Sequence, residues 1–353
     1  MSVVETPEPT MAAVSVGSDV TDERWDAYVQ AHPAASVYHL AAWPRLLARV
    51  FRRDLQMLTA TVDGRVTGVL PLIGFRSRVF GTFAVSLPFV NYGGVLADDV
   101  ASERALLDAA IGVARSWGAS HLELRHTDQK FGGLQSKRHK VAMTMALQST
   151  PDAQWQALDR KLRNQVRKAE KSGLTVTIGG ATDVDGFFDV FSHNMRDLGT
   201  PVYSKRFFED MLATFPEHSR VFTVLHRGQP VASAVTQVFR DTFEVPSASS
   251  LREFRTLCPN VLLYWEMVRF AVSAGLTTFD FGRSTPGDGT FLYKQQWGAE
   301  AHPLVWEYWT ANGVHLPDRN RENPKFAAAI AAWQRLPVSL ATALGPAISR
   351  NLP

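Results

Sequence analysis

Two kinds of hydrophobic pattern follow one another along the first part of the chain. Apolar and polar residues alternate from Leu55 to Val62 and again from Val66 to Ile73. Because Asp63-Gly64 separates these runs, they are predicted to form a β-hairpin. Between Ser102 and Trp117, apolar residues recur at helical spacing. The elements predicted here are helices at residues 22–30, 43–51 and 102–117, and strands at residues 55–62, 66–73, 83–89 and 121–124.

The second part of the chain repeats this order. Strands are predicted at residues 174–178, 220–225, 231–239 and 277–281, and helices at residues 183–198, 205–215 and 261–273. When the two parts are aligned, Asp63-Gly64 matches Arg227-Gly228, and Leu122-Glu123-Leu124 matches Phe279-Asp280-Phe281. We interpret this as an internal duplication of a mixed α/β unit. The polar residues 127–140 are predicted to form a loop between the copies.

The pattern therefore predicts an α/β (α+β) fold of two tandem domains with mixed sheets. The chain has 353 residues, which is long enough for two domains. The predicted division is a flexible N-terminal tail at 1–18, a first domain at 19–149, a second domain at 150–312 that holds the active site, and a C-terminal helical segment at 313–353 that packs on the first domain.

The strand at residues 277–281 leads into the stretch with the most candidate chemistry. Glycines and a proline after it predict a loop that places Arg283, and then Lys294, near the end of a buried strand. Ligands commonly bind at the carboxyl ends of strands in open α/β sheets. A structural interpretation stays open: Arg283 could pair with Asp280 or Asp288, and Lys294 could be solvated.

A basic helix is predicted between Trp155 and Gly173. Its apolar residues fall on one face, whereas the other faces carry cations and amides, namely Arg160, Arg163, Asn164, Gln165, Arg167 and Lys168. Guanidinium groups one turn apart are suited to phosphate. The alternative is a solvated helix face.

Composition excludes several classes of function. The formal net charge is only +3, so no field of the whole protein favours nucleic acid, and we expect no DNA partner. The single cysteine, Cys258, excludes internal disulfides, and the ten histidines lack metal-ligand spacing, so no metal site is predicted. The N-terminal residues lack the pattern of a signal peptide, which predicts a cytoplasmic protein.

Several motifs together resemble the FemAB family, and more narrowly its branch associated with exosortase (PEP-CTERM) and exopolysaccharide systems. The motifs are Lys161-Leu162-Arg163-Asn164-Gln165-Val166-Arg167-Lys168, Phe279-Asp280-Phe281-Gly282-Arg283-Ser284, Tyr293-Lys294-Gln295-Gln296-Trp297-Gly298 and Tyr92-Gly93-Gly94-Val95. The resemblance implies two tandem GNAT-like acyltransferase domains and transfer of an aminoacyl or acyl group to an amine, as in peptidoglycan building.

The resemblance also implies roles for individual residues. Arg163 and Arg167, with Asn164 and Lys168 beside them, match the helix that holds substrate phosphate. Tyr293 and Lys294 match the pair at the reacting carbonyl. Apart from the resemblance, Asp280 and Tyr293 are candidate bases, and Arg283, Gln296 and Trp297 are candidate substrate-binding residues.

The donor is expected to be aminoacyl-tRNA or an acyl-thioester, with no bound cofactor. The residues from Arg252 to Cys258 contain no glycine, unlike the pyrophosphate loop of CoA-dependent relatives, which disfavours acetyl-CoA. The acceptor is expected to be an amine-bearing envelope or glycan precursor. The competing hypothesis is a non-catalytic protein that binds RNA or an anionic glycan through residues 160–171.

The C-terminal residues 324–353 carry an amphipathic pattern broken near Leu336-Pro337. Packing onto the first domain is the favoured interpretation. The alternative is an interfacial helix that contacts the membrane peripherally, on its inner face.

Overall fold

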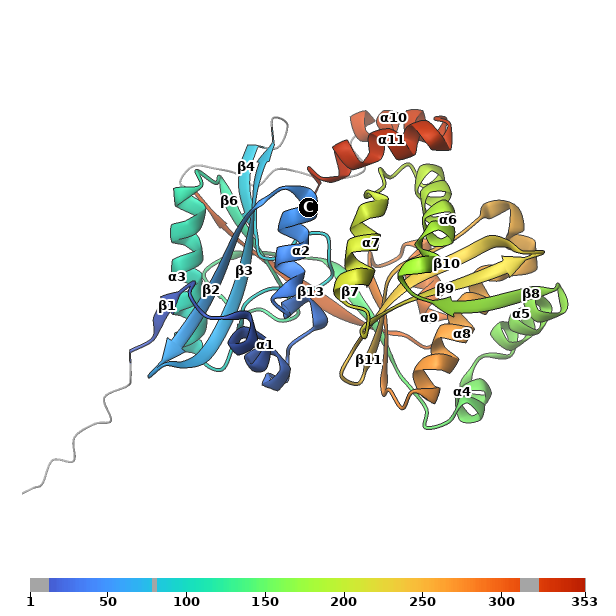
Figure 1. Cartoon of the computed structure of the whole chain (residues 1–353), viewed down its shortest axis with the longest axis horizontal. Helices are drawn as coiled ribbons and strands as arrows, with labels where there is room; N and C mark the ends of the chain where they lie inside the picture. Colours follow the sequence, from blue (N-terminus) through green and yellow to red (C-terminus); the bar gives the residue numbers. More distant parts are fainter. Residues whose placement is uncertain (1–12, 78–80, 312–323, 353) are drawn as a thin grey trace, which may run out of the picture.

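The computed structural model describes residues 13–77, 81–311 and 324–352, and its strands form one 13-stranded mixed sheet (Figure 1). From edge to edge the order is β1 (Ser15–Gly17), β2 (Asp54–Val62), β3 (Arg65–Ser77), β4 (Gly81–Val85), β6 (His121–His126), β13 (Glu300–Thr310), β7 (Gln135–Ala146), β12 (Thr278–Ser284), β11 (Thr242–Ser250), β10 (Gln229–Phe239), β9 (Ser219–His226) and β8 (Leu174–Gly179). A short strand, β5 (Leu96–Ala97), pairs with β3.

Helices cover both faces of the sheet. One face carries α1 (Asp22–Ala31), α2 (Ala42–Phe51), α6 (Val184–Asp197) and α7 (Lys205–Thr214), and the other carries α3 (Val100–Ser116), α5 (Arg160–Lys171) and α8 (Pro259–Ser273). The remaining helical segments are η1 (Val37–His39), α4 (Pro151–Ala157), η2 (Ala181–Asp183), η3 (Arg252–Leu257), α9 (Gly289–Gln295), α10 (Pro324–Gln334) and α11 (Val338–Ser349). The predicted mixed α/β fold with repeated units is confirmed.

The two halves exchange a strand. β7, from the end of the first half, pairs with β12 of the second half. β13, from the end of the second half, pairs with β6 of the first half, and β7 and β13 pair with each other. The sheet is therefore continuous across the two halves. The domain division after residue 149 stays a prediction, since strands from both sides of it interleave.

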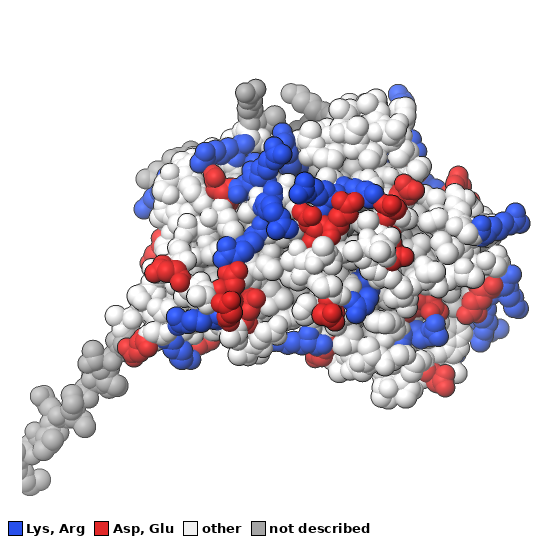
Figure 2. All heavy atoms as spheres, in the orientation of Figure 1, with Lys and Arg blue, Asp and Glu red and all other residues white. Residues whose placement is uncertain are grey.

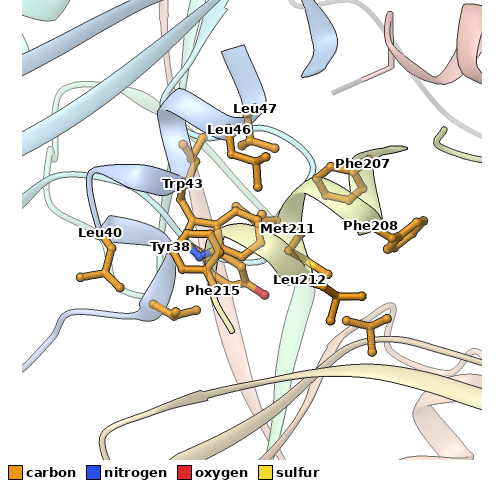
Figure 3. Packing of buried hydrophobic residues seen from close by; sticks show 14 of the residues in the cluster. Tyr38, Leu40, Trp43, Leu46, Leu47, Phe207, Phe208, Met211, Leu212 and Phe215 are labelled. Atoms are coloured by element: carbon orange, nitrogen blue, oxygen red, sulfur yellow. The ribbon is translucent and has the colours of Figure 1, made fainter. Parts of the chain in front are cut away.

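A hydrophobic core joins the halves on the face that carries α2 and α7. The rings of Trp43 on α2 and Phe215 at the end of α7 stack with their centres 4.9 Å apart. Tyr38 packs edge-on against Trp43, as Figure 3 shows. The rings of Tyr38 and Trp43 are fully buried, so this core fixes the position of Tyr38.

Three local predictions were wrong. Residues 127–140 were expected to be a loop, but Gln135–Ala146 is the strand β7; its first five residues are polar and exposed, so they show no hydrophobic alternation. Ser15–Gly17 belongs to the sheet through its pairing with β2, rather than to a flexible tail; residues 1–12 lie outside the described residues. The basic helix is two helices, α4 and α5, because the chain is extended at Leu158 and Asp159 caps the second helix.

The C-terminal helices contact mainly the second half, whereas we expected them on the first. α10 and α11 pack on α6, and Arg196 of α6 donates a hydrogen bond to the carbonyl of Leu336. Contact with the first half comes from Arg53, whose guanidinium binds the carbonyl of Arg350 and the side chain of Asn351. Residues 312–323 of the predicted segment lie outside the described residues.

Candidate active site between the two halves

Two buried carboxyl groups lie side by side where the second half meets the first. Glu244 on β11 and Asp280 on β12 are partners in a parallel ladder. Only 5% of Glu244 and 4% of Asp280 is exposed. Side chains alternate between the two faces along a strand, so Glu244 lies on the face opposite to its neighbours Phe243 and Val245. Both faces of this strand are covered, so Glu244 is buried as they are. Buried carboxyl groups in contact are uncommon unless they serve a function.

Residues of the first half complete the surroundings of Glu244. The Tyr38 hydroxyl donates a hydrogen bond to Glu244 Oε1 at 2.7 Å, and the Asn91 Nδ2 donates to the same oxygen at 2.6 Å. Tyr38 is held by the core shared between the halves, and Asn91 comes from the loop after β4. The carboxyl group of one half is thus oriented by the other half.

Asp280 has a donor from each half. The Tyr92 hydroxyl donates to Asp280 Oδ2 at 2.6 Å, and the backbone N–H of Gly282 donates to Oδ1 at 2.7 Å. Gly282 has a φ of +72°, a left-handed conformation that favours glycine, and an added Cβ would lie 3.1 Å from the carbonyl oxygen of Val245. Glycine at this position therefore allows the turn that binds the carboxylate.

Burial changes the acidity of both groups. It raises the pKa of Glu244 to about 8, and the neighbouring Asp280 adds to this effect. Burial also raises the pKa of Asp280, against the hydrogen bond from Tyr92. Since two adjacent carboxylates repel each other, the pair retains a proton near neutral pH and can exchange it in that range.

Lys294 lies on α9 behind the turn at Gly282. Its ammonium group donates to the carbonyl oxygens of Gly282 and Arg283, at 3.1 Å each, and only 7% of the residue is exposed. Burial lowers the pKa of Lys294 to about 8, and the nearby Asp280 opposes this shift. An ammonium group has three N–H bonds, so one is available beyond the two carbonyls. Lys294 is therefore held close to the carboxyl pair, and is not solvated as the alternative interpretation assumed.

The other candidate residues between 280 and 298 lie in different places relative to the carboxyl pair. The Arg283 side chain lines the interface between the halves, and its Nη1 is buried without a hydrogen-bond partner. Tyr293 faces the opposite way, because its hydroxyl donates to the carbonyl of Asn260 at 3.3 Å on α8. Trp297 is buried in the core of the second half, and Gln296 is exposed. Asp280, Arg283 and Lys294 thus come together, whereas Tyr293, Gln296 and Trp297 do not join them.

One cavity is lined by the carboxyl pair, and a second lies on the far side of the residues that donate to Glu244. A cavity of about 330 Å³ is lined by both carboxyl residues and by first-half residues that include Tyr92, Arg125 and His126. A second cavity of about 270 Å³ is lined mostly by apolar side chains, together with Tyr38, Asn91 and Arg283. Both cavities are built from the two halves, so ligands at the pair would contact both.

The basic helix lies elsewhere in the second half. α5 packs on α8 and β8, at the edge of the sheet farthest from the first half (Figure 1). The Arg163 Nη1 donates to Gln156, and the Arg167 guanidinium lies over the Trp155 ring at 5.3 Å. Asn164 and Lys168 are exposed and line a shallow hollow on α5.

A groove connects α5 with the end of α9. It measures about 600 Å³ and is lined by Lys161 on one side and by residues 295–298 on the other. Figure 2 shows basic side chains at the edge where α5 lies, and also in a strip between the halves. The structure brings Gln296 and Trp297 near α5, but it does not bring α5 to the carboxyl pair.

Glu244, Tyr38 and Arg125 were not among the site residues predicted from the sequence. The signal for Glu244 was a single acidic residue in the otherwise apolar run Phe243 to Val245. Arg125 offers a similar signal, since it follows Leu124 on a strand whose residues are all buried. Within the described ranges, no cluster of three or more His, Cys, Asp or Glu residues could hold a metal ion. None of the helices in those ranges has the length and apolarity needed to cross a membrane.

Comparisons with known proteins agree with this architecture. Residues 157–295 match the family model described as an acetyltransferase (GNAT) domain. No curated protein sequence matches the chain. A crystal structure of FemX is similar, with a TM-score of 0.67, 17% identity, and coverage of 84% of this chain and 98% of that one.

Two further solved structures share the fold. A tandem GNAT protein from the clavulanic acid biosynthesis pathway has a TM-score of 0.53 and 12% identity, covering 86% of this chain and 100% of its own. The C-terminal domain of a putative lysylphosphatidylglycerol synthetase from Agrobacterium fabrum has a TM-score of 0.55 and 12% identity, covering 88% and 95%. The chain thus has a tandem GNAT-like fold and carries a GNAT-type acyltransferase domain.

Proposed function

We propose that the protein is an N-acyltransferase of the FemAB type, which transfers an aminoacyl or acyl group to an amine of a cell-envelope or exopolysaccharide-related substrate. The observation that carries the proposal is the buried pair of Glu244 and Asp280, completed by residues of both halves. The similarity to the FemX structure supports the same type of enzyme. The exosortase-associated branch is part of the proposal and rests on sequence motifs alone.

The chemistry follows from the groups at the pair. The acceptor amine attacks the acyl carbonyl, forming an N–C bond, and loses a proton to the ionised member of the pair. The bond between the carbonyl carbon and the donor's sulfur or oxygen then breaks, and the pair returns the proton to that leaving group. Lys294 contributes its remaining N–H to the oxyanion that develops on the carbonyl oxygen. Arg283 orients the substrate from the same interface.

The donor is proposed to be aminoacyl-tRNA or an acyl-thioester; the GNAT domain supports an acyl-thioester. Arg163, Arg167, Asn164 and Lys168 are proposed to hold donor phosphate on α5. Their position supports this, because α5 packs on α8. α8 begins directly after the segment Arg252–Leu257, and a GNAT fold would hold its donor at that segment. That segment is a 3₁₀ helix without glycine, which still disfavours acetyl-CoA.

The test is an assay of the purified protein with charged tRNAs and with acyl-thioesters as separate donors, with amine-bearing glycan and muropeptide precursors as acceptors. We expect amide formation with one donor class, and loss of turnover in Glu244→Gln. Amide formation at equal rates in Glu244→Gln would overturn the role of the pair.

A peripheral membrane position on the cytoplasmic side is proposed for the same enzyme. α11 buries Ala341 and Gly345 against the second half, but it exposes an apolar stripe of Leu340, Leu344 and Ile348, each more than 40% exposed. An exposed stripe at helical spacing is typical of a helix at a membrane interface. Such a position would bring the site to a lipid-linked acceptor.

The non-catalytic alternative has one observation in its favour. In the part of the chain that the structure describes, no carboxylate forms an ion pair with Arg160, Lys161 or Lys168, and all three are exposed. A phosphate-bearing polymer could contact them. Steep salt dependence of RNA binding, without turnover on any donor, would favour this alternative.

A further inference from the structure

Two guanidinium groups from opposite halves lie against one tryptophan ring near the centre of the sheet. Trp306 on β13 is the cross-strand partner of Arg125 on β6. The Arg125 Cζ lies 4.3 Å from the centre of the Trp306 ring, and the Arg283 Cζ, from β12, lies 5.3 Å from it. The strand exchange that places β13 between the halves therefore also brings these two cations together.

Three polar groups at this place have unused donors. Arg125 Nη1, Arg283 Nη1 and Trp306 Nε1 are all buried without a hydrogen-bond partner within the described residues. A buried donor left without a partner costs about 1–3 kcal/mol. Three such donors gather around one ring, and this arrangement suits a ligand that accepts several hydrogen bonds.

The charge at this place also favours an anion. Glu123 is a carboxylate that contacts one of these two cations: its Oε1 accepts a hydrogen bond from Arg125 Nε at 2.8 Å. Arg125 and Glu123 are almost completely buried, so water screens neither of them. One carboxylate beside two guanidinium groups leaves a positive charge, and Arg offers the planar fork that binds carboxylate or phosphate bidentately.

The apolar cavity beside Arg283 indicates that the bound anion has an apolar group attached to it. Among the sixteen residues that line this cavity of about 270 Å³, Arg283 is the single charged one. Most of the others are aromatic or aliphatic, such as Phe89, Met195 and Phe207. The same cavity contains Tyr38, which donates to Glu244. A molecule in it would place its apolar part against the aromatic rings, with one end at Arg283 and the other beside Tyr38, the donor to Glu244.

We propose that Arg125, Arg283 and Trp306 form an oxyanion subsite, which binds the carboxylate or phosphate of an acceptor whose apolar part fills the adjacent cavity. The assignment of this ligand to the acceptor rests on the proposed function. The binding of an apolar oxyanion does not, since it needs no turnover. The subsite selects acceptors that combine an amine, an apolar group and an anionic group.

The test measures, by calorimetry on the full-length protein, the binding of three probes that have the same number of carbon atoms: hexanoate, hexyl phosphate and the uncharged 1-hexanol. We expect at least one anionic probe to bind about tenfold or more tightly than 1-hexanol, the gain typical of hydrogen bonds to charged groups. Tighter binding of hexanoate identifies a carboxylate subsite, and tighter binding of hexyl phosphate a phosphate subsite. Equal binding of all three probes would overturn the proposal.

A matched pair of variants locates the site. Arg283→Gln should remove the preference for the anion, whereas Arg115→Gln should keep it, because Arg115 also stacks on a tryptophan of β13, Trp309 at 5.4 Å, but is exposed. If Arg283→Gln does not fold, Arg283→Lys and Arg125→Lys keep the charge and lose the fork, and each should weaken anion binding severalfold. Unchanged anion binding in the folded variants would overturn the proposal, even for an enzyme with full acyltransferase activity.

Discussion

Glu244 on β11 and Asp280 on β12 face each other across neighbouring parallel strands, with their hydrogen-bond donors supplied largely by the other half of the chain. Strands in a sheet lie about 4.8 Å apart, so the two carboxyl groups must share one small volume. Their acidity therefore depends on the first half as well as the second, and any movement between the halves would change it.

Replacement of Glu244 by glutamine should lower kcat/KM by about 10²–10⁴-fold, the usual contribution of a general base. The amide keeps the hydrogen bond from Tyr38, so the fold should persist. Steady-state kinetics with the donor identified by the assay would measure the loss. Glu266→Gln is the control: Glu266 is a partly buried carboxylate on α8 that pairs with the exposed Arg269, and its replacement should leave the rate unchanged. Similar rates in both variants would contradict the assignment.

Loss of the Lys294 ammonium group should lower kcat by about 10²–10³-fold, as expected for one oxyanion donor. Lys294→Met keeps the buried length of the side chain but loses the hydrogen bonds to Gly282 and Arg283, so circular dichroism should accompany the kinetics. A folded Lys294→Met variant with nearly normal kcat would show that Lys294 only supports the turn.

The pH dependence of kcat/KM should be bell-shaped with its maximum near pH 8. The rate rises as Glu244, with a pKa of about 8, loses its proton, and it falls as Lys294, with a pKa also lowered to about 8, loses its charge. Lys294→Arg should remove the alkaline fall, because a guanidinium group stays charged. A rate that is flat between pH 6 and pH 10, or an alkaline fall retained in Lys294→Arg, would contradict this account.

The stability of the protein should also respond to Glu244. Its pKa is raised from 4.5 when unfolded to about 8 when folded, so between these values the native state holds a proton that the unfolded state releases. The free energy of unfolding therefore falls as pH rises from 4.5 to 8. Glu244→Gln lacks this titration, so its free energy of unfolding should rise relative to that of the wild type by about 5 kcal/mol across that range. Urea unfolding of both proteins at several pH values would measure the difference, and a constant difference would refute the shifted pKa.

Leu344→Glu on α11 should weaken pelleting with anionic liposomes severalfold, because it places a charge in the exposed apolar stripe. Ile178→Glu is the matched control: Ile178 is similarly exposed, 47% against 45%, but lies on the edge strand β8. Equal pelleting of the two variants would rule out α11 as the membrane contact.

Sequence patterns revealed the fold better than the site. The hairpin at Asp63-Gly64 and the strand leading to Gly282 follow local rules, and the structure contains both. β7 was missed because half of it is exposed and polar, and its partners β12 and β13 lie far along the sequence. Nor could any local pattern pair Glu244 with Asp280, which lie 36 residues apart and meet only through a parallel ladder.

The strand exchange has a consequence for how the protein is made. β13 is the last strand among the residues that the structure describes, and it is the neighbour of β6 in the first half. Until residue 310 has left the ribosome, the facing edges of β6 and β7 have unpaired backbone groups, which can recruit strands from other nascent chains. The sheet of the first half therefore cannot be completed before β13 has been synthesised, because its last neighbour comes from the second half of the chain.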